Sequence, residues 1–229
     1  MKKRIGRLAA VLAAAGILLT GCGKVDVSMY RDVENACAAT ALQSGGVLQI
    51  QSKAPETEDM NLCFTYCYDT DGVMQYCIEQ TDRTGRRIFL EHHDGNVMQR
   101  WLLGHGSSVY DETDSEFVRY TKEHPYKYLS LLTNLPEKGQ LTDIGMTESD
   151  GQKCYRMTLD VQKVTGEMDA DQVLQSREVT YTLSADGLVC GYTEQSSYLC
   201  ENTEEKVYTL TVTLSDIGAV GEVKLPTVE

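Results

Sequence analysis

The sequence predicts an α+β domain in which one curved, mostly antiparallel β-sheet, a half-barrel, packs on one or two helices. An amphipathic segment with helical spacing opens the domain, and the apolar period changes from 3.6 to 2 residues after Gly45-Gly46. The later segments are apolar on one side only, which is typical of an antiparallel sheet with one buried and one solvated face. Two stacked sheets would also fit this alternation, but the helical segments offer a more economical cover for a single sheet.

The first helix is expected to begin at Ser28, whose hydroxyl is suited to an N-cap. Apolar residues then recur at helical spacing while charged residues lie off that stripe, and Gly45-Gly46 ends the helix. The stripe comprises Met29, Val33, Ala36, Cys37 and Thr40.

Two hairpins follow a first strand at residues 47–51. The first hairpin joins residues 62–68 to residues 73–80, and the second joins residues 87–93 to residues 97–103. A three-residue turn in the first hairpin pairs Tyr66 with Tyr76 and Phe64 with Ile78. The turn of the second places Leu90 opposite Trp101, Phe89 opposite Leu102, and Glu91 opposite Arg100.

The middle of the chain is less regular. Residues 115–124 predict a helical turn, and residues 126–135 predict a short helix between Pro125 and Pro136. Strands resume at residues 152–161, and an acidic insertion at 165–176 is expected to be helical over residues 171–175. The remaining expected strands are residues 179–183, 188–192 and 208–214.

The N-terminal residues resemble a bacterial lipoprotein signal. Four positive charges precede an apolar run of 12 residues, which is shorter than the roughly 20 residues of a membrane-spanning helix. The run ends in Leu19-Thr20-Gly21-Cys22, which resembles the lipobox of that family. The resemblance implies cleavage before Cys22 and a diacylglycerol on its thiol. Residues 1–21 are then the signal peptide, 22–27 a short tether, and 28–229 a single domain.

The charge of the chain argues against several partners. Removing residues 1–21 deletes four positive charges and no acids, so the formal net charge moves from −13 to −17. Such a surface repels phosphate backbones and anionic headgroups, which excludes nucleic acid as an expected partner. Membrane attachment therefore depends on the acyl chains of Cys22, and the protein is expected on the extracytoplasmic face of the membrane.

Three cysteines lie in the stretch CFTYCYDTDGVMQYC, residues 63–77. On a strand, Cys63 and Cys67 lie about 13 Å apart at about 3.3 Å per residue, too far to share one zinc ion. A calcium loop that begins at Asp69 would need Gly at its sixth position and Glu at its twelfth, where this sequence has Met74 and Gln80. The expected register places Cys77 about 7–8 Å from the other two by Cα, beyond the usual reach of a disulfide, so the thiols are expected to be free.

No catalytic constellation is recognisable. His92 and His93 are adjacent on an expected strand and point to opposite faces, so they do not make a common metal site. Gly104-His105-Gly106-Ser107-Ser108 places a histidine near a serine but is not a nucleophile elbow, and a turn explains it better. The chain is therefore expected to be non-enzymatic, with no catalytic residue, no metal and no cofactor.

The order of lipobox, helix, strand meander, central helix and closing strand VTLSDIGAVGEVKLP resembles LolA-like and LppX/LprG-like lipoproteins. The resemblance implies a sheet with an apolar concavity that receives acyl chains of lipids or lipoproteins. Soluble carriers of that group lack the anchor expected here. An alternative is a cell-surface interaction or sensory module without a small ligand. The expected ligand-lining residues are Phe64, Tyr66, Met74, Tyr76, Trp101, Met157 and Tyr181.

Overall fold

The computed structural model describes residues 25–55, 59–164, 172–200 and 204–226. The predicted signal, Cys22 and residues 165–171 of the acidic insertion lie outside these ranges. Within them, no helix combines the length and the apolar character needed to cross a bilayer.

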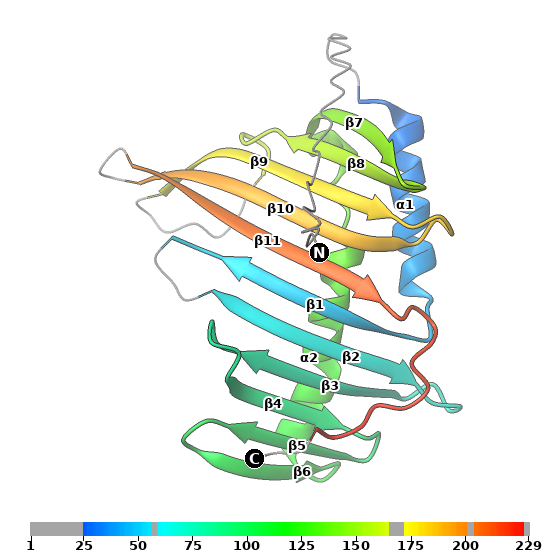
Figure 1. Ribbon diagram of the computed structural model, residues 1–229, viewed down its shortest axis with the longest axis vertical. Coiled ribbons are helices and arrows are strands. Elements are labelled where there is room, and N and C mark those ends of the chain that lie inside the picture. The colour runs from blue at the N-terminus through cyan, green and yellow to red at the C-terminus, as the bar shows by residue number, and fades with distance from the viewer. Residues whose placement is uncertain (1–24, 56–58, 165–171, 201–203, 227–229) are drawn as a thin grey trace, which may run out of the picture.

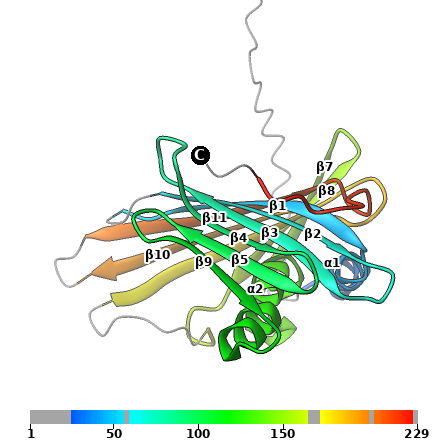
Figure 2. The same cartoon turned by 90° about the horizontal axis from the view of Figure 1, so that it is seen from below.

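A single sheet of eleven described strands forms one layer, and two helices lie against one of its faces (Figures 1 and 2). All hydrogen-bonded neighbours are antiparallel, in the order β6-β5-β4-β3-β2-β1-β11-β10-β9-β8-β7. The first and last strands of the chain thus pair at the centre of the sheet. The predicted fold class, a curved antiparallel sheet packed on helices, is confirmed. The strands are β1 (Gly45–Lys53), β2 (Met60–Tyr68), β3 (Met74–Thr81), β4 (Arg87–His93), β5 (Val97–Leu102), β6 (Gly106–Asp111), β7 (Leu141–Ser149), β8 (Gln152–Leu159), β9 (Gln172–Leu183), β10 (Val189–Cys200) and β11 (Glu205–Ser215).

The two predicted hairpin registers are confirmed. Tyr66 pairs with Tyr76, and Cys77 lies opposite Thr65. In the next hairpin, Leu90 pairs with Trp101 and the other two predicted partners also hold. Side chains alternate between the faces of each strand, so these registers decide which residues meet the helices.

Helix α1 (Val27–Ala41) has its N-cap two residues before the expected one. Asp26 is the N-cap, and its carboxylate accepts hydrogen bonds from the backbone N–H groups of Ser28 and Met29. Ser28 was expected to be the cap and is instead inside the helix. The predicted apolar stripe is confirmed, since Val33, Ala36, Cys37 and Thr40 are buried.

Helix α2 (Ser115–Thr133) is one continuous helix rather than the expected turn and separate short helix. Pro125 lies inside it, although proline removes a backbone hydrogen bond and usually interrupts a helix. Tertiary packing compensates, because Phe117 on one side of Pro125 and Leu132 on the other are buried against the sheet and α1.

Two strands were not expected, and a third is longer than expected. The predicted turn at Gly104–Ser108 is shorter, because Gly106–Asp111 continue as edge strand β6. Strand β7 forms the other edge, after a short 3₁₀ turn at Lys138–Gln140. Residues 172–175 belong to β9 instead of a helix, because pairing with β10 buries Leu174 in the core.

The main core lies between the helices and the inner face of the sheet, defined here as the face that contacts α1 and α2. A second, smaller apolar cluster lies on the opposite, outer face. There the segment after β11 crosses β1 to β4 (Figure 1), and Val223 packs against Cys67, Cys77 and Leu90. The imidazole Nε2 of His92 lies 3.3 Å from the carbonyl oxygen of Val223. We call residues 216–226 the C-terminal strap.

Candidate ligand-binding site

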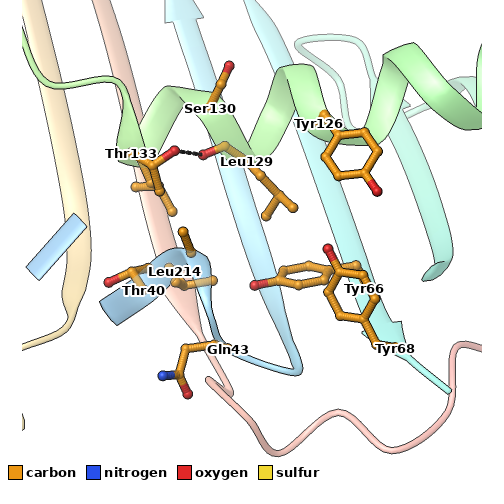
Figure 3. Close-up of a pocket in the computed structure, with 11 residues that line it drawn as sticks. Thr40, Gln43, Tyr66, Tyr68, Tyr126, Leu129, Ser130, Thr133 and Leu214 are labelled. Atoms are coloured by element: carbon orange, nitrogen blue, oxygen red, sulfur yellow. Dashed lines mark hydrogen bonds between the residues drawn. The ribbon is translucent and has the colours of Figure 1, made fainter. Parts of the chain in front are cut away.

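An apolar cavity of about 290 Å³ lies on the inner face, between the C-terminal end of α1 and the C-terminal half of α2 (Figure 3). Its floor comes from β2 and β11, and its walls come from the two helices. The lining residues are Thr40, Ala41, Gln43, Tyr66, Tyr68, Tyr126, Leu129, Ser130, Leu132, Thr133 and Leu214.

Local sequence explains how the floor is shaped. Gly46 has no side chain, and a Cβ there would lie 2.8 Å from Cδ1 of Leu214 and 3.4 Å from the ring of Tyr66. Leu214 and Tyr66 can therefore lie close together below the helices. Above them, Tyr126 and Leu129 project from α2 at helical spacing toward the cavity (Figure 3).

The polar groups of the cavity are neutral. The rings of Tyr66 and Tyr68 meet edge to face, 6.2 Å apart. Burial raises the pKa of Tyr66 to about 12, and burial together with the nearby Tyr126 raises the pKa of Tyr68. Both phenols therefore stay protonated at neutral pH. Since no Asp, Glu, Lys, Arg or His is among the lining residues, the cavity suits an uncharged, largely apolar group.

The seven residues predicted to line a ligand site do not lie together in one cavity. Six of them lie in the main core, with side chains that are nearly inaccessible to solvent: Phe64, Tyr66, Met74, Tyr76, Met157 and Tyr181. Only Tyr66 also lines the cavity. Most of the predicted lining is therefore packed core.

Trp101 lies on the outer face, not on the predicted inner one. Its ring packs with the smaller cluster around Leu90 and Val223. The reason is the register of β4 and β5, in which Glu91 and Arg100 take the inner face and their neighbours Leu90 and Trp101 take the outer face.

The helical walls of the cavity were missed at the sequence level. The spacing of Tyr126, Leu129 and Thr133 in the predicted short helix was a usable signal, because residues three and four apart share one face. The contribution of Thr40 and Gln43 depends on how α1 approaches α2, and no local pattern indicates that approach.

A buried ionic cluster lies on the inner face beside the N-terminal half of α2. The side chain of Glu91 is fully buried and receives hydrogen bonds from the guanidinium of Arg100, with Nε at 3.0 Å, and from the hydroxyl of Tyr76 at 2.9 Å. The ring of Tyr120, from α2, lies 3.7 Å from the guanidinium carbon of Arg100. Burial and the adjacent carboxylate raise the pKa of Tyr76, so its hydroxyl remains a donor. Every strong polar group is paired, which makes this cluster a structural support.

His93 lies beside that cluster. Its Nδ1 is 2.9 Å from the carbonyl oxygen of Met74 and therefore carries the proton, whereas Nε2 is buried without a partner among the described residues. The imidazole packs between the rings of Tyr76 and Phe117. Burial lowers the pKa of His93, so the ring is neutral at pH 7.

The structure supports no metal or disulfide site in its described part. No group of three or more His, Cys, Asp or Glu residues is arranged to hold a metal ion there. The seven cysteines after Cys22 are free, as the hairpin register predicted for the first cluster. Burial raises the pKa of Cys77 to about 12, and that of Cys67 also rises through burial. These thiols are therefore protonated and poorly nucleophilic.

No protein-family model matches the sequence, and no curated protein matches it significantly. Several solved structures, in contrast, are similar to this chain in fold. Lipoprotein LppX from Mycobacterium tuberculosis superposes with a TM-score of 0.52 and 10% identity, covering 87% of this chain and 100% of that one. LprF from Mycobacterium bovis gives a TM-score of 0.46 at 9% identity, covering 90% and 99% of the two chains. A LolA superfamily protein from Nitrosomonas europaea gives 0.27 at 10% identity, covering 87% and 94%.

At this low identity, the similarity to LppX concerns the fold alone. It nevertheless confirms what the order of the predicted elements indicated. The chain has an LppX-like fold, an open curved sheet whose inner face is covered by helices.

Proposed function

We propose that this protein is a membrane-anchored, non-enzymatic lipoprotein that binds an apolar or amphiphilic ligand, such as an acyl chain of a lipid or of another lipoprotein. The observation that carries the proposal is the apolar, uncharged cavity between α1, α2 and the inner face of the sheet. Its volume lies at the lower end of the range of about 300–1,000 Å³ for small-molecule sites. It therefore suits one apolar chain better than a bulky lipid.

The route into the cavity supports an amphiphilic ligand. Tyr126 is 55% exposed, whereas Tyr66 below it is 2% exposed, so the lining passes from solvent into the core. An apolar chain can lie against Leu129 and Leu214 while its polar end stays near the rim. Gln43 and the tyrosine hydroxyls offer hydrogen bonds to that end.

The anchor is a separate part of the proposal. Cys22 in the Leu-Thr-Gly-Cys sequence is the residue that would carry the lipid, and helix α1 begins at Val27, five residues later. At about 3.3–3.6 Å per residue, this tether keeps the domain within about 20 Å of the bilayer. Cys22→Ser should move the exported protein from the membrane fraction to the soluble fraction and abolish incorporation of labelled palmitate. Retention in the membrane fraction would contradict the anchor.

The binding proposal is tested on the exported full chain with Cys22→Ser, analysed by native mass spectrometry for co-purifying lipid. Leu129→Trp should fill the cavity and lower lipid occupancy at least about tenfold, because the larger ring takes the space of the chain. Val118→Trp is the matched control, since Val118 is on the same helix but 43% exposed and outside the cavity. Equal occupancy in both variants would contradict a ligand in this cavity.

A protein-interaction or sensory module remains the second candidate, and one observation favours it. Phe64, Tyr76 and Tyr181 fill the inner face with fully buried rings, which leaves a smaller concavity than the fold would allow. A protein that purifies without lipid under the conditions above, and binds no added fatty alcohol, would support this second function over the first.

A further inference from the structure

Two clusters of the same composition lie on the inner face at different ends of the sheet. The first consists of Glu91, Arg100 and Tyr76 on β3 to β5. The second consists of Glu194, Arg177 and Tyr192 on β9 and β10. In both, the guanidinium forms an ion pair with the carboxylate, and the tyrosine hydroxyl donates to the same carboxylate. Arg100 donates hydrogen bonds through both Nε and Nη2, whereas Arg177 donates through Nη2 alone.

The first cluster shows what such an arginine does with its flat face. Arg100 is covered by the ring of Tyr120 at 3.7 Å, and the ring of Phe89 lies 5.6 Å from its guanidinium carbon. Its side chain is only 16% exposed. The guanidinium plane is therefore stacked by aromatic residues of this chain, an arrangement stabilised by cation–π attraction.

The second cluster has a similar ion pair without the ring. Nη2 of Arg177 donates to the carboxylate of Glu194 at 3.1 Å, whereas Nε lies 2.9 Å from the carboxylate and makes no hydrogen bond to any residue that the structure describes. The carboxylate also accepts hydrogen bonds from Tyr192 at 2.7 Å and Ser196 at 3.2 Å. Among the described residues, no aromatic ring stacks on Arg177, and its side chain is 30% exposed.

Open space borders Arg177. Arg177 and Glu194 line a cavity of about 400 Å³ between the C-terminal end of α2 and β8 to β10. Its lining is mixed: apolar residues such as Leu131, Leu135, Val164 and Val179 alternate with polar residues such as Ser130, Asn134 and Gln140. A second cavity, of about 320 Å³, shares Glu194 in its lining and also includes Tyr198 and Tyr208. We call these two cavities the Arg177 groove.

The charges of the groove select the kind of ligand. The charge of Arg177 is already balanced by Glu194, and Glu137 adds a negative charge to the lining, so the groove does not favour an anion. An uncharged ring with an apolar edge matches both the flat face of Arg177 and the leucine and valine wall.

We propose that the Arg177 groove is a second ligand site, distinct from the cavity between α1 and α2, which binds a neutral aromatic ring stacked on Arg177 in the manner of Tyr120 on Arg100. The ring belongs to a small aromatic compound or to the aromatic end of an amphiphile. The two cavities share Ser130 but otherwise have different linings from this part of the chain, with Leu129 and Leu132 in one and Leu131 and Leu135 in the other.

The test uses 4-butylphenol and 4-butylcyclohexanol as matched neutral probes, titrated into the exported full chain with Cys22→Ser by isothermal calorimetry. The phenol should bind about tenfold more tightly than the saturated alcohol, because only the aromatic ring gains cation–π attraction. Arg177→Lys keeps a positive charge beside Glu194 but removes the flat guanidinium, and should abolish the preference. Leu129→Trp should leave it unchanged.

A second measurement keeps the test independent of altered folding. In the NMR spectrum of ¹⁵N-labelled protein that keeps Arg177, the phenol should shift the Nε–Hε resonance of Arg177 by ring current. The Nε–Hε resonance of Arg100 should stay in place. Equal affinity for the two probes, a preference that survives Arg177→Lys, or a shift of Arg100 alone would overturn the proposal. Loss of binding in Leu129→Trp alone would place the phenol in the other cavity and also overturn it.

Discussion

The two acid–arginine–tyrosine clusters share their residue types but differ in how much of their surroundings is closed. Around Glu91 and Arg100, α2 covers the inner face, and the C-terminal strap covers the outer face of the neighbouring strands. Around Glu194 and Arg177, the inner face opens into the Arg177 groove. A buried ion pair thus acts as a structural support where it is enclosed, and it offers a recognition surface where a cavity reaches it.

Strand register contributes to this difference. Glu91 and Arg100 are direct cross-strand partners, so the two side chains meet in the plane below α2. Arg177 is paired with Ser196 and reaches Glu194 along the diagonal. With this diagonal contact, the side chain of Arg177 stays 30% exposed and lines the cavity.

The largest expected difference between the clusters is in stability. Glu91→Gln leaves the guanidinium of Arg100 in a closed site without its carboxylate, and should lower the free energy of unfolding by about 3–5 kcal/mol. Glu194→Gln is the matched change in the open cluster. It should cost only about 1–2 kcal/mol, because water in the groove can solvate Arg177. Urea unfolding of both variants measures the difference, and equal costs would contradict the contrast between closed and open clusters.

The next largest effect on stability is expected for the C-terminal strap, which lies on the outer face of the sheet near Glu91 and Arg100. Val223→Asp should detach the strap and lower the free energy of unfolding by about 2 kcal/mol, since a buried valine is lost. It should also expose Cys67 and Cys77, whose labelling by a maleimide would then approach that of the partly exposed Cys154 and Cys190.

Leu225→Asp is the control for the strap, because Leu225 belongs to the same segment but is 41% exposed. It should leave the labelling pattern unchanged. Slow labelling of Cys67 and Cys77 in Val223→Asp would show that the strap does not shield them.

The smallest expected effect is a pH dependence of the free energy of unfolding, which arises from His93 beside the Glu91–Arg100 cluster. His93 is buried and neutral, and its pKa is lowered by burial. The charges of the nearby Asp94, His92 and Glu91 act on it, and the rings of Tyr76 and Phe117 pack against the imidazole. As the pH falls through about 6.5, the unfolded chain binds a proton that folded His93 does not. The free energy of unfolding should therefore fall, by at most about 1.4 kcal/mol per pH unit.

His93→Phe should remove this contribution and flatten the dependence of urea unfolding between pH 7 and pH 5. His105→Gln, a change at an exposed imidazole, is the control and should leave the dependence in place. A slope that persists in His93→Phe would assign the acid sensitivity to other groups.

Local patterns predicted much of the sheet and little of the candidate site. Alternation and turn residues sufficed for the hairpins, because cross-strand neighbours there are close in sequence. Strands β6 and β7 were missed because they are edge strands, whose mostly exposed side chains show little alternation. The predicted lining residues proved to be core, since the residues of a filled core and of a ligand site have the same apolar pattern.

The amino-acid sequence by itself determined the fold class, the two hairpin registers and the separation of Cys63, Cys67 and Cys77 from the inner face, because each depends on the period of two along a strand. The tertiary structure decided the continuity of α2 through Pro125, the outward position of Trp101 and the place of both cavities. These features arise where segments distant in sequence pack together. Which side chains are covered, and which gap remains open, is set there by the summed packing and not by any local pattern.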